Sequence, residues 1–227
     1  MDDILSTSEA AQRIGVSERQ VRNLINSHLL ASVADNAVTE SSVARYKLNR
    51  NGASRRAWSE STAWQAVAIL AHSDVTTIGQ SQKSRLTAAL RTMSAEQFVL
   101  AVRNRAHTYR CVGHRHSAAR ISRELVNVNT GTAILSLTAT AENVDGYATA
   151  TTIEQIIARY HLRVNFGASD AALLRAVTAV DIDVVRKVNE DSEVLAALSL
   201  SESLDTRERS AGLDFLKRAL KEGTDAN

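Results

Sequence analysis

The sequence predicts a mostly helical α+β fold, on three observations. Apolar residues recur at helical spacing over much of the chain, for example in residues 59–72 and 205–220. Residues 108–112 alternate instead like a half-buried strand. The length of 227 residues and the hydrophobic share of 44% are those of a globular protein with two or three compact units. We expect a first unit in residues 1–52, a helical connector in residues 53–105 and a C-terminal α+β domain in residues 106–227.

The first unit opens with two short amphipathic helices joined by a tight turn. Ser8 is expected to cap the first helix, in which Ala11 and Ile14 lie on one apolar face. Gly15 follows and supplies the turn, because glycine adopts turn conformations at little cost. Ser17 is then placed to cap the second helix.

The second helix is expected to have one apolar and one polar side. Val21, Leu24 and Ile25 should face the core. Arginine forms paired hydrogen bonds with guanine, and asparagine or glutamine with adenine, so the polar side suits a DNA major groove. The residues expected at DNA in this part of the chain are Ser17, Arg19, Gln20, Arg22, Asn23 and Asn26.

The matching residues, in order, are Ser8, Glu9-Ala10-Ala11, Gly15-Val16-Ser17 and Val21-Arg22. With them the opening resembles the winged helix-turn-helix of the excisionase and MerR type. That resemblance implies a short two-stranded wing in residues 29–38 and a further helix in residues 41–48. The wing departs from the family pattern, since residues 34–37 contain Asp35 and no Arg or Lys.

Positive charge is concentrated after the wing. Residues 45–56 contain no acid, and their basic residues are Arg45, Lys47, Arg50, Arg55 and Arg56. We expect Arg50, Arg55 and Arg56 to contact DNA phosphates, because phosphate contacts require only a nearby cation. Asn51, Gly52 and Ser54 mark the joint to the connector.

The connector and the C-terminal domain contain several further elements. Helices are expected in residues 59–72, 80–91 and 94–105, with Ser59 or Ser61 as the first cap and a capping box from Ser94 to Gln97. Beyond them we expect strands in residues 108–112, 133–140, 162–166 and 173–180, another at Tyr147, and helices in residues 152–160, 192–200 and 205–220. Residues 180–190 are expected to form a loop.

A second resemblance covers this half of the chain. Its residues are Arg103, Arg105, Tyr109-Arg110, Val144-Asp145-Gly146-Tyr147, Ala158-Arg159-Tyr160, Leu162-Arg163-Val164-Asn165 and the closing segment 194–213. They are similar to actinobacterial regulators encoded beside nucleotidyltransferase toxins, which are grouped with abortive-infection E-type antitoxins. The resemblance implies an operator at the protein's own promoter and a nucleotidyltransferase-like toxin as partner.

Charge is unevenly distributed, although the formal net charge is only +2. Residues 103–123 hold six arginines and three histidines without an acid, and predict a basic surface. Residues 181–205 hold seven acids against Arg186 and Lys187. On the closing helices, Glu193, Glu202, Asp205 and Glu208 are expected to remain available to a basic partner, while leucines such as Leu198 and Leu216 are buried.

No catalysis, metal or cofactor is expected. The chain has no glycine-rich phosphate loop, nucleophile elbow or His-Glu metal helix. Cys111, His107, His114 and His116 offer metal-ligand types, but no distant second pair completes a tetrahedral zinc site. A single cysteine and the absence of an apolar run of spanning length favour a cytoplasmic protein without a membrane partner.

These observations together predict a sequence-specific repressor of duplex operator DNA, and by resemblance an autoregulating antitoxin. One recognition helix covers few base pairs, so we expect a homodimer or a cooperative pair. Three alternatives remain open: an excisionase-type factor that bends DNA, a MerR-like ligand sensor, and a protein-binding antitoxin with little DNA role. Chain length disfavours the first, and the lack of a sustained heptad pattern disfavours the second.

Overall fold

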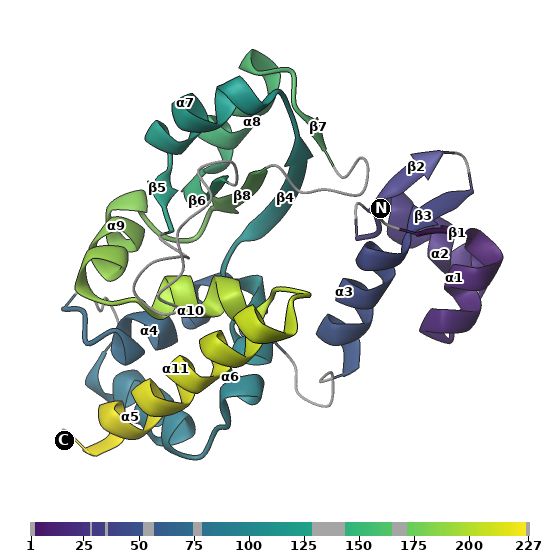
Figure 1. Ribbon diagram of the computed structural model, residues 1–227. Helices are drawn as coiled ribbons and strands as arrows, with labels where there is room; N and C mark the ends of the chain where they lie inside the picture. Colours follow the sequence, from purple (N-terminus) through teal and green to yellow (C-terminus); the bar gives the residue numbers. More distant parts are fainter. Residues whose placement is uncertain are drawn as a thin grey trace.

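The computed structural model describes residues 3–27, 29–34, 36–51, 57–74, 79–128, 144–164 and 172–225 (Figure 1). As the sequence predicts, the fold is mostly helical α+β, and the described residues form a three-stranded and a five-stranded sheet. No helix in these ranges combines the length and the apolar character that a membrane crossing needs.

Residues 3–51 fold around one small apolar core. Their elements are β1 (Ile4–Ser6), α1 (Thr7–Ile14), α2 (Glu18–Asn26), β2 (Ser32–Ala34), β3 (Ala37–Thr39) and α3 (Glu40–Asn51). Gly15 joins α1 to α2 with a φ of 75°, in the left-handed region that glycine adopts most easily. The buried core of residues 3–51 consists of Leu5, Ala10, Ala11, Ile14, Val21, Leu30, Val38 and Val43.

The predicted cap of α1 is wrong by two residues. Ser6 caps the helix: its Oγ accepts a hydrogen bond from the Glu9 amide at 3.2 Å, and its own amide donates to the Glu9 carboxylate at 2.8 Å. Ser8 instead lies exposed within the first turn. A Ser with Glu three residues later forms a reciprocal capping box, which Ser8 cannot do. Hydrogen bonds from Ser6 also hold the pKa of Glu9 below its ordinary value.

The small sheet has one strand more than the sequence analysis predicted. β2 and β3 pair in an antiparallel hairpin that extends one residue beyond the segment 29–38 expected for the wing. β1 pairs with the other edge of β3 and places Leu5 opposite Val38. Both side chains are buried, so the first strand closes the core that α1 and α2 cover. Three residues are too few for a periodic signal, which explains why β1 was missed.

Residues 57–225 form the five-stranded sheet and the helices that pack against it. Their helices are α4 (Glu60–Leu70), α5 (Gln80–Arg91), α6 (Ala95–Ala101), the 3-10 turns η1 (Arg103–Arg105) and η2 (Arg115–Ser117), α7 (Ala118–Arg123), α8 (Ala150–Arg159), α9 (Ile182–Asp191), α10 (Val194–Ser201) and α11 (Thr206–Asp225). Their strands are β4 (His107–Val112), β5 (Val126–Asn127), β6 (Val144–Thr149), β7 (Arg163–Val164) and β8 (Ala172–Val177).

The sheet is covered by helices on both faces (Figure 1). Its order is β5-β6-β8-β4-β7, and only β6 and β8 run parallel. Successive side chains of β8 point to opposite faces of the sheet. Leu174 packs with α7 and α8 through Ile121, Ile153 and Ile156. Val177 packs on the other face, in the larger core that includes α4 and α10.

The larger core unites the predicted connector with the closing helices. Trp64 of α4 and Phe98 of α6 share it with Leu198 of α10 and Leu216 of α11. Gly212 of α11 lies so close to α10 that a Cβ there would be 2.5 Å from the Ala197 carbonyl oxygen. Residues on both sides of position 105 thus contribute to this core.

Several predicted elements need correction. The helix expected in residues 94–105 ends at Ala101 and continues as η1. Residues 180–190 do not form a loop: α9 occupies most of them, because Asp181 caps it through the Asp183 amide at 2.9 Å and Val185 and Val188 are buried. The strand predicted for residues 133–140 lies outside the described residues.

Candidate functional site

The polar side of α2 is the first candidate site. Val21 is buried and Leu24 and Ile25 are half-buried, as the helical spacing predicts. The exposed residues on this helix are Glu18, Arg19, Gln20, Arg22, Asn23 and Asn26. Ser17 caps α2 in the predicted way, with its Oγ accepting from the Gln20 amide at 3.3 Å. Whether these residues bind DNA stays a prediction.

Two of the predicted contact residues are held by bonds within α2. The side-chain oxygen of Gln20 accepts from the Ser17 amide at 3.1 Å and completes a capping box. Arg22 donates to the Glu18 carboxylate at 3.3 Å across one helical turn. The sequence pattern correctly predicted that Gln20 and Arg22 are exposed, but these local bonds were missed.

With Ser17 engaged as the cap, three of the six predicted contact residues remain, and they form a line along the helix. Arg19, Asn23 and Asn26 make no side-chain hydrogen bond or ion pair with another described residue. Their spacing of four and then three residues places them on one face of α2. We call them the α2 stripe. At a rise of about 1.5 Å per residue, it extends for about 10 Å.

The residues predicted to contact phosphates lie largely outside the described part of the chain. Arg50 belongs to α3, but its side chain is not described, and Arg55 and Arg56 lie beyond the described residues. Arg13 of α1 forms an ion pair with Glu40 at the start of α3. That pair fixes α3 against α1.

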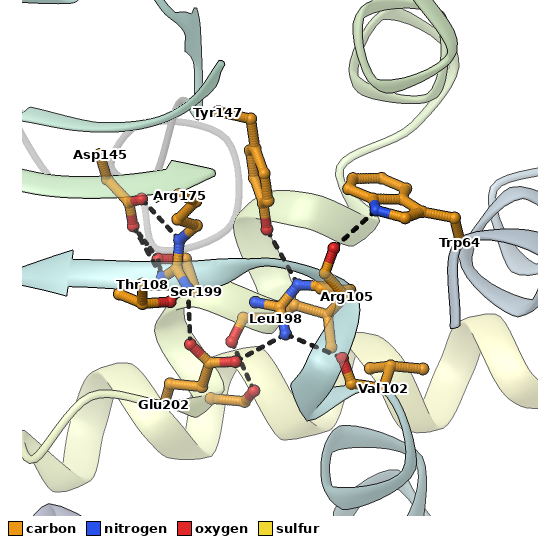
Figure 2. Close-up of polar contacts among 11 residues, drawn as sticks. Trp64, Val102, Arg105, Thr108, Asp145, Tyr147, Arg175, Leu198, Ser199 and Glu202 are labelled. Atoms are coloured by element: carbon orange, nitrogen blue, oxygen red, sulfur yellow. Dashed lines mark hydrogen bonds and ion pairs between the residues drawn. The ribbon is translucent and has the colours of Figure 1, made fainter. Parts of the chain in front are cut away.

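A second polar arrangement lies buried between the large sheet and α10 (Figure 2). Arg175 of β8 is 2% exposed. Its guanidinium donates to the Asp145 carboxylate of β6 at 2.9 and 3.3 Å, and to Glu202 after α10 at 2.9 Å. Ser199 of α10 accepts from the same guanidinium at 3.0 Å and donates to Asp145.

Glu202 also binds a second buried arginine, Arg105 of η1 (Figure 2). Arg105 Nη1 donates to Glu202 at 2.7 Å, and its Nε donates to the Tyr147 hydroxyl at 2.9 Å. The Arg105 carbonyl accepts from the indole of Trp64 at 2.7 Å. Two arginines and two carboxylates thus form a cluster with no net charge, which we call the buried ion cluster: Arg105, Asp145, Arg175 and Glu202.

The buried ion cluster corrects two predictions. Arg105 was expected on a basic surface but is 1% exposed, and Glu202 was expected to face a partner but lies between Arg105 and Arg175. Burial of a charge is tolerated only when opposite charges and hydrogen bonds accompany it. Asp205 is also engaged within the fold: its carboxylate accepts hydrogen bonds from the amides of Arg207 and Glu208 at the start of α11. Fewer acids of residues 181–205 are therefore available to a partner than the sequence predicts.

The electrostatics of the buried ion cluster fix its charge states. Burial alone would raise the pKa of Glu202, but Arg105 and Arg175 outweigh it and lower that pKa to about 2. The pKa values of both arginines are raised, because their carboxylate partners outweigh the effect of burial. A carboxylate with so low a pKa is a poor general base near neutral pH. The arrangement is suited to holding α10 on the sheet.

The residues considered for a metal do not come together. Cys111 is buried in β4, whereas His114 and His116 are exposed with ring centroids 4.7 Å apart. Within the described ranges, no group of three or more His, Cys, Asp or Glu residues is placed to hold a metal ion.

Comparisons of the chain with protein-family models, curated proteins and solved structures find no match.

Proposed function

We propose that this protein is a sequence-specific DNA-binding repressor whose N-terminal unit is a winged helix-turn-helix with α2 as recognition helix. The observation that supports this most is the α2 stripe. Arg19, Asn23 and Asn26 are exposed on one face, and their donors and acceptors are not used by other described residues. Solvation is the simpler role for polar residues on a helix, but it does not require arginine and asparagine in one line.

The α2 stripe matches the chemistry of base edges. Arg19 can donate two parallel hydrogen bonds to guanine, and Asn23 can donate to and accept from adenine. A stripe of about 10 Å covers about three base pairs, since successive base pairs are about 3.4 Å apart. So short a site requires two copies of the protein on repeated half-sites about one helical turn apart.

The test is selection of preferred duplexes from a random library, followed by affinity measurements. Arg19→Ala and Asn23→Ala should each lower affinity for the selected site by about 1–3 kcal/mol, or about 5- to 150-fold, and relax base choice at one position. Gln12→Ala is the control, because Gln12 is exposed on α1, outside the proposed contact. Equal affinity and unchanged base preference in all three variants would refute recognition by α2.

We further propose, on the sequence resemblance alone, that the C-terminal half neutralises a nucleotidyltransferase-like toxin. Truncation is a poor test, because a chain ending near residue 125 would remove Glu202 from Arg105. Coexpression of the full chain and of Arg19→Ala/Asn23→Ala with the neighbouring gene's product, from an unrelated promoter, separates the two roles. Protection by both proteins is expected. Loss of protection in the variant would assign neutralisation to DNA binding.

An excisionase-type role is distinguished by the shape of the bound DNA. A repressor needs only occupancy of its operator, whereas an architectural factor must bend the duplex. A circular-permutation mobility assay on the selected site reports this directly. A strong bend without effect on transcription would favour the architectural role.

A further inference from the structure

Two acid-free surface segments meet at one end of the large sheet. One is residues 112–123, which run from the end of β4 through η2 and α7, and the other is residues 159–163, between α8 and β7. Val112 pairs with Arg163, and a Cβ on Gly113 would lie 2.4 Å from the side chain of Leu162. Arg159 and Tyr160 both reach Glu124 at 2.8 Å. The second segment therefore contacts the first near both of its ends.

The first segment presents a basic helical face. Ala118 and Ile121 are buried in the core beneath α7, whereas Arg120 and Arg123 of α7 and His116 of the preceding turn η2 are exposed. Arg120 and Arg123 are three residues apart and lie on one face of α7. The ring of exposed His114 lies 4.7 Å from that of His116, and exposed His161 adds a third imidazole from the second segment. We call these residues the α7 basic face: His114, His116, Arg120, Arg123 and His161.

The α7 basic face is not neutralised by nearby acids. Residues 103–123 contain no Asp or Glu. Glu124, at the end of α7, is engaged by Arg159 and Tyr160. Arg120 and Arg123 form no ion pair with any residue in the described ranges. Cations in the last turn of a helix interact favourably with the helix dipole, but that effect does not account for the exposed His114 and His116 that precede α7.

We propose that the α7 basic face binds the phosphate backbone of duplex DNA without regard to sequence, as a second contact of the DNA-bound protein. This inference rests on the proposed function. Phosphate contacts require cations and donors but no apolar anchor, whereas protein interfaces centre on buried aromatic or aliphatic side chains. Among the described residues, the large exposed apolar side chains are Ile4 and Leu29, both in the N-terminal unit. The composition of the α7 basic face therefore favours nucleic acid over a protein.

The test measures salt-dependent binding of the full chain to a random-sequence duplex of 30 base pairs. Arg120→Gln/Arg123→Gln should reduce the slope of log affinity against log salt concentration by about 1.8, since each lost phosphate contact contributes about 0.9. Arg120→Lys/Arg123→Lys should retain the slope. The matched control is Arg85→Gln/Arg207→Gln, which removes the same charge from exposed positions on α5 and α11. It should leave the slope unchanged.

The outcomes separate this proposal from recognition by α2. If Arg120→Gln/Arg123→Gln has the slope of its matched control, the α7 basic face does not contact DNA, whatever the α2 variants do. If its slope falls while Arg19→Ala and Asn23→Ala keep full site preference, this proposal stands and recognition by α2 is wrong. Unchanged DNA binding with loss of binding to the neighbouring gene's product would make the face a protein-docking surface and overturn the proposal.

Discussion

The α2 stripe and the buried ion cluster both contain arginine, but in opposite surroundings. Arg19 of α2 is exposed and has no partner among the described residues, whereas Arg105 and Arg175 are 1% and 2% exposed and bound to carboxylates. The difference lies in where the opposite charge comes from. Glu202 pairs with an arginine 97 positions earlier in the chain. A count of charges along the sequence cannot separate an arginine that stabilises the fold from one that is available to a ligand.

The comparison predicts that charge removal affects folding in one region and binding in the other. Glu202→Gln should have the largest effect, because it leaves two buried arginines with one carboxylate. We expect the free energy of unfolding to fall by about 3–5 kcal/mol. Urea denaturation measures it, with exposed Glu193→Gln as control. A loss no greater than that of the control would show that the buried ion cluster does not stabilise the fold.

The pH dependence of stability sharpens the same point. Glu202 has a pKa of about 2 in the folded chain against an ordinary value of 4.5. A lowered pKa contributes stability above pH 4.5, and this contribution is lost as pH falls from 4.5 towards 2. The expected contribution is about 3 kcal/mol. The stability difference between the native chain and Glu202→Gln should therefore be constant from pH 7 to 5 and shrink below that. A constant difference down to pH 3 would contradict the pKa.

A smaller effect tests local bonds in the N-terminal unit. Ser6→Ala should destabilise α1 by about 1 kcal/mol, because it removes the acceptor for the Glu9 amide. Ser8→Ala should have little effect, since Ser8 is exposed in the first turn and does not cap the helix. Hydrogen exchange of the α1 amides reports both. Equal protection in the two variants would show that the capping box is not formed.

The smallest expected effect concerns the ion pair within α2. Glu18→Gln removes the partner of Arg22, and exposed pairs of this spacing contribute only about 0.3–0.5 kcal/mol. If α2 binds DNA, affinity should rise, because a carboxylate is lost and Arg22 is released towards phosphates. A fall in affinity, measured by fluorescence anisotropy on the selected site, would place Glu18 itself at a base.

Features encoded by neighbouring residues could be predicted from the sequence. The bounds of α5, 80–91, and the capping box of Ser94 and Gln97 are confirmed. The exposed and buried sides of α2 are confirmed as well, because one helical period fixes them. Within the site, the bonds of Gln20 and Arg22 were missed, although both have a local signal: Ser17 and Gln20 have capping-box spacing, and Glu18 and Arg22 are four residues apart.

Features that depend on distant residues could not be predicted. Arg175 and Tyr147 both face α10 because β6 and β8 pair in parallel, and the register of that pairing is set by the whole sheet. Glu202 follows a helix that is buried on all sides, so no polar face marked its direction. The acid was therefore grouped with its solvent-exposed neighbours in sequence.

The 97 positions between Arg105 and Glu202 also set an order of events during synthesis. The N-terminal unit is complete once β3 has paired with β1 and α3 has formed, all within the first 51 residues. Arg105 leaves the ribosome before Glu202 has been synthesised. At about 5–20 residues per second, Glu202 follows about 5–20 s later. During that interval the nascent chain can already hold a folded α2 while its second half is open. If α2 binds DNA as proposed, the nascent chain would be able to bind DNA before it could bind any partner that requires the finished sheet.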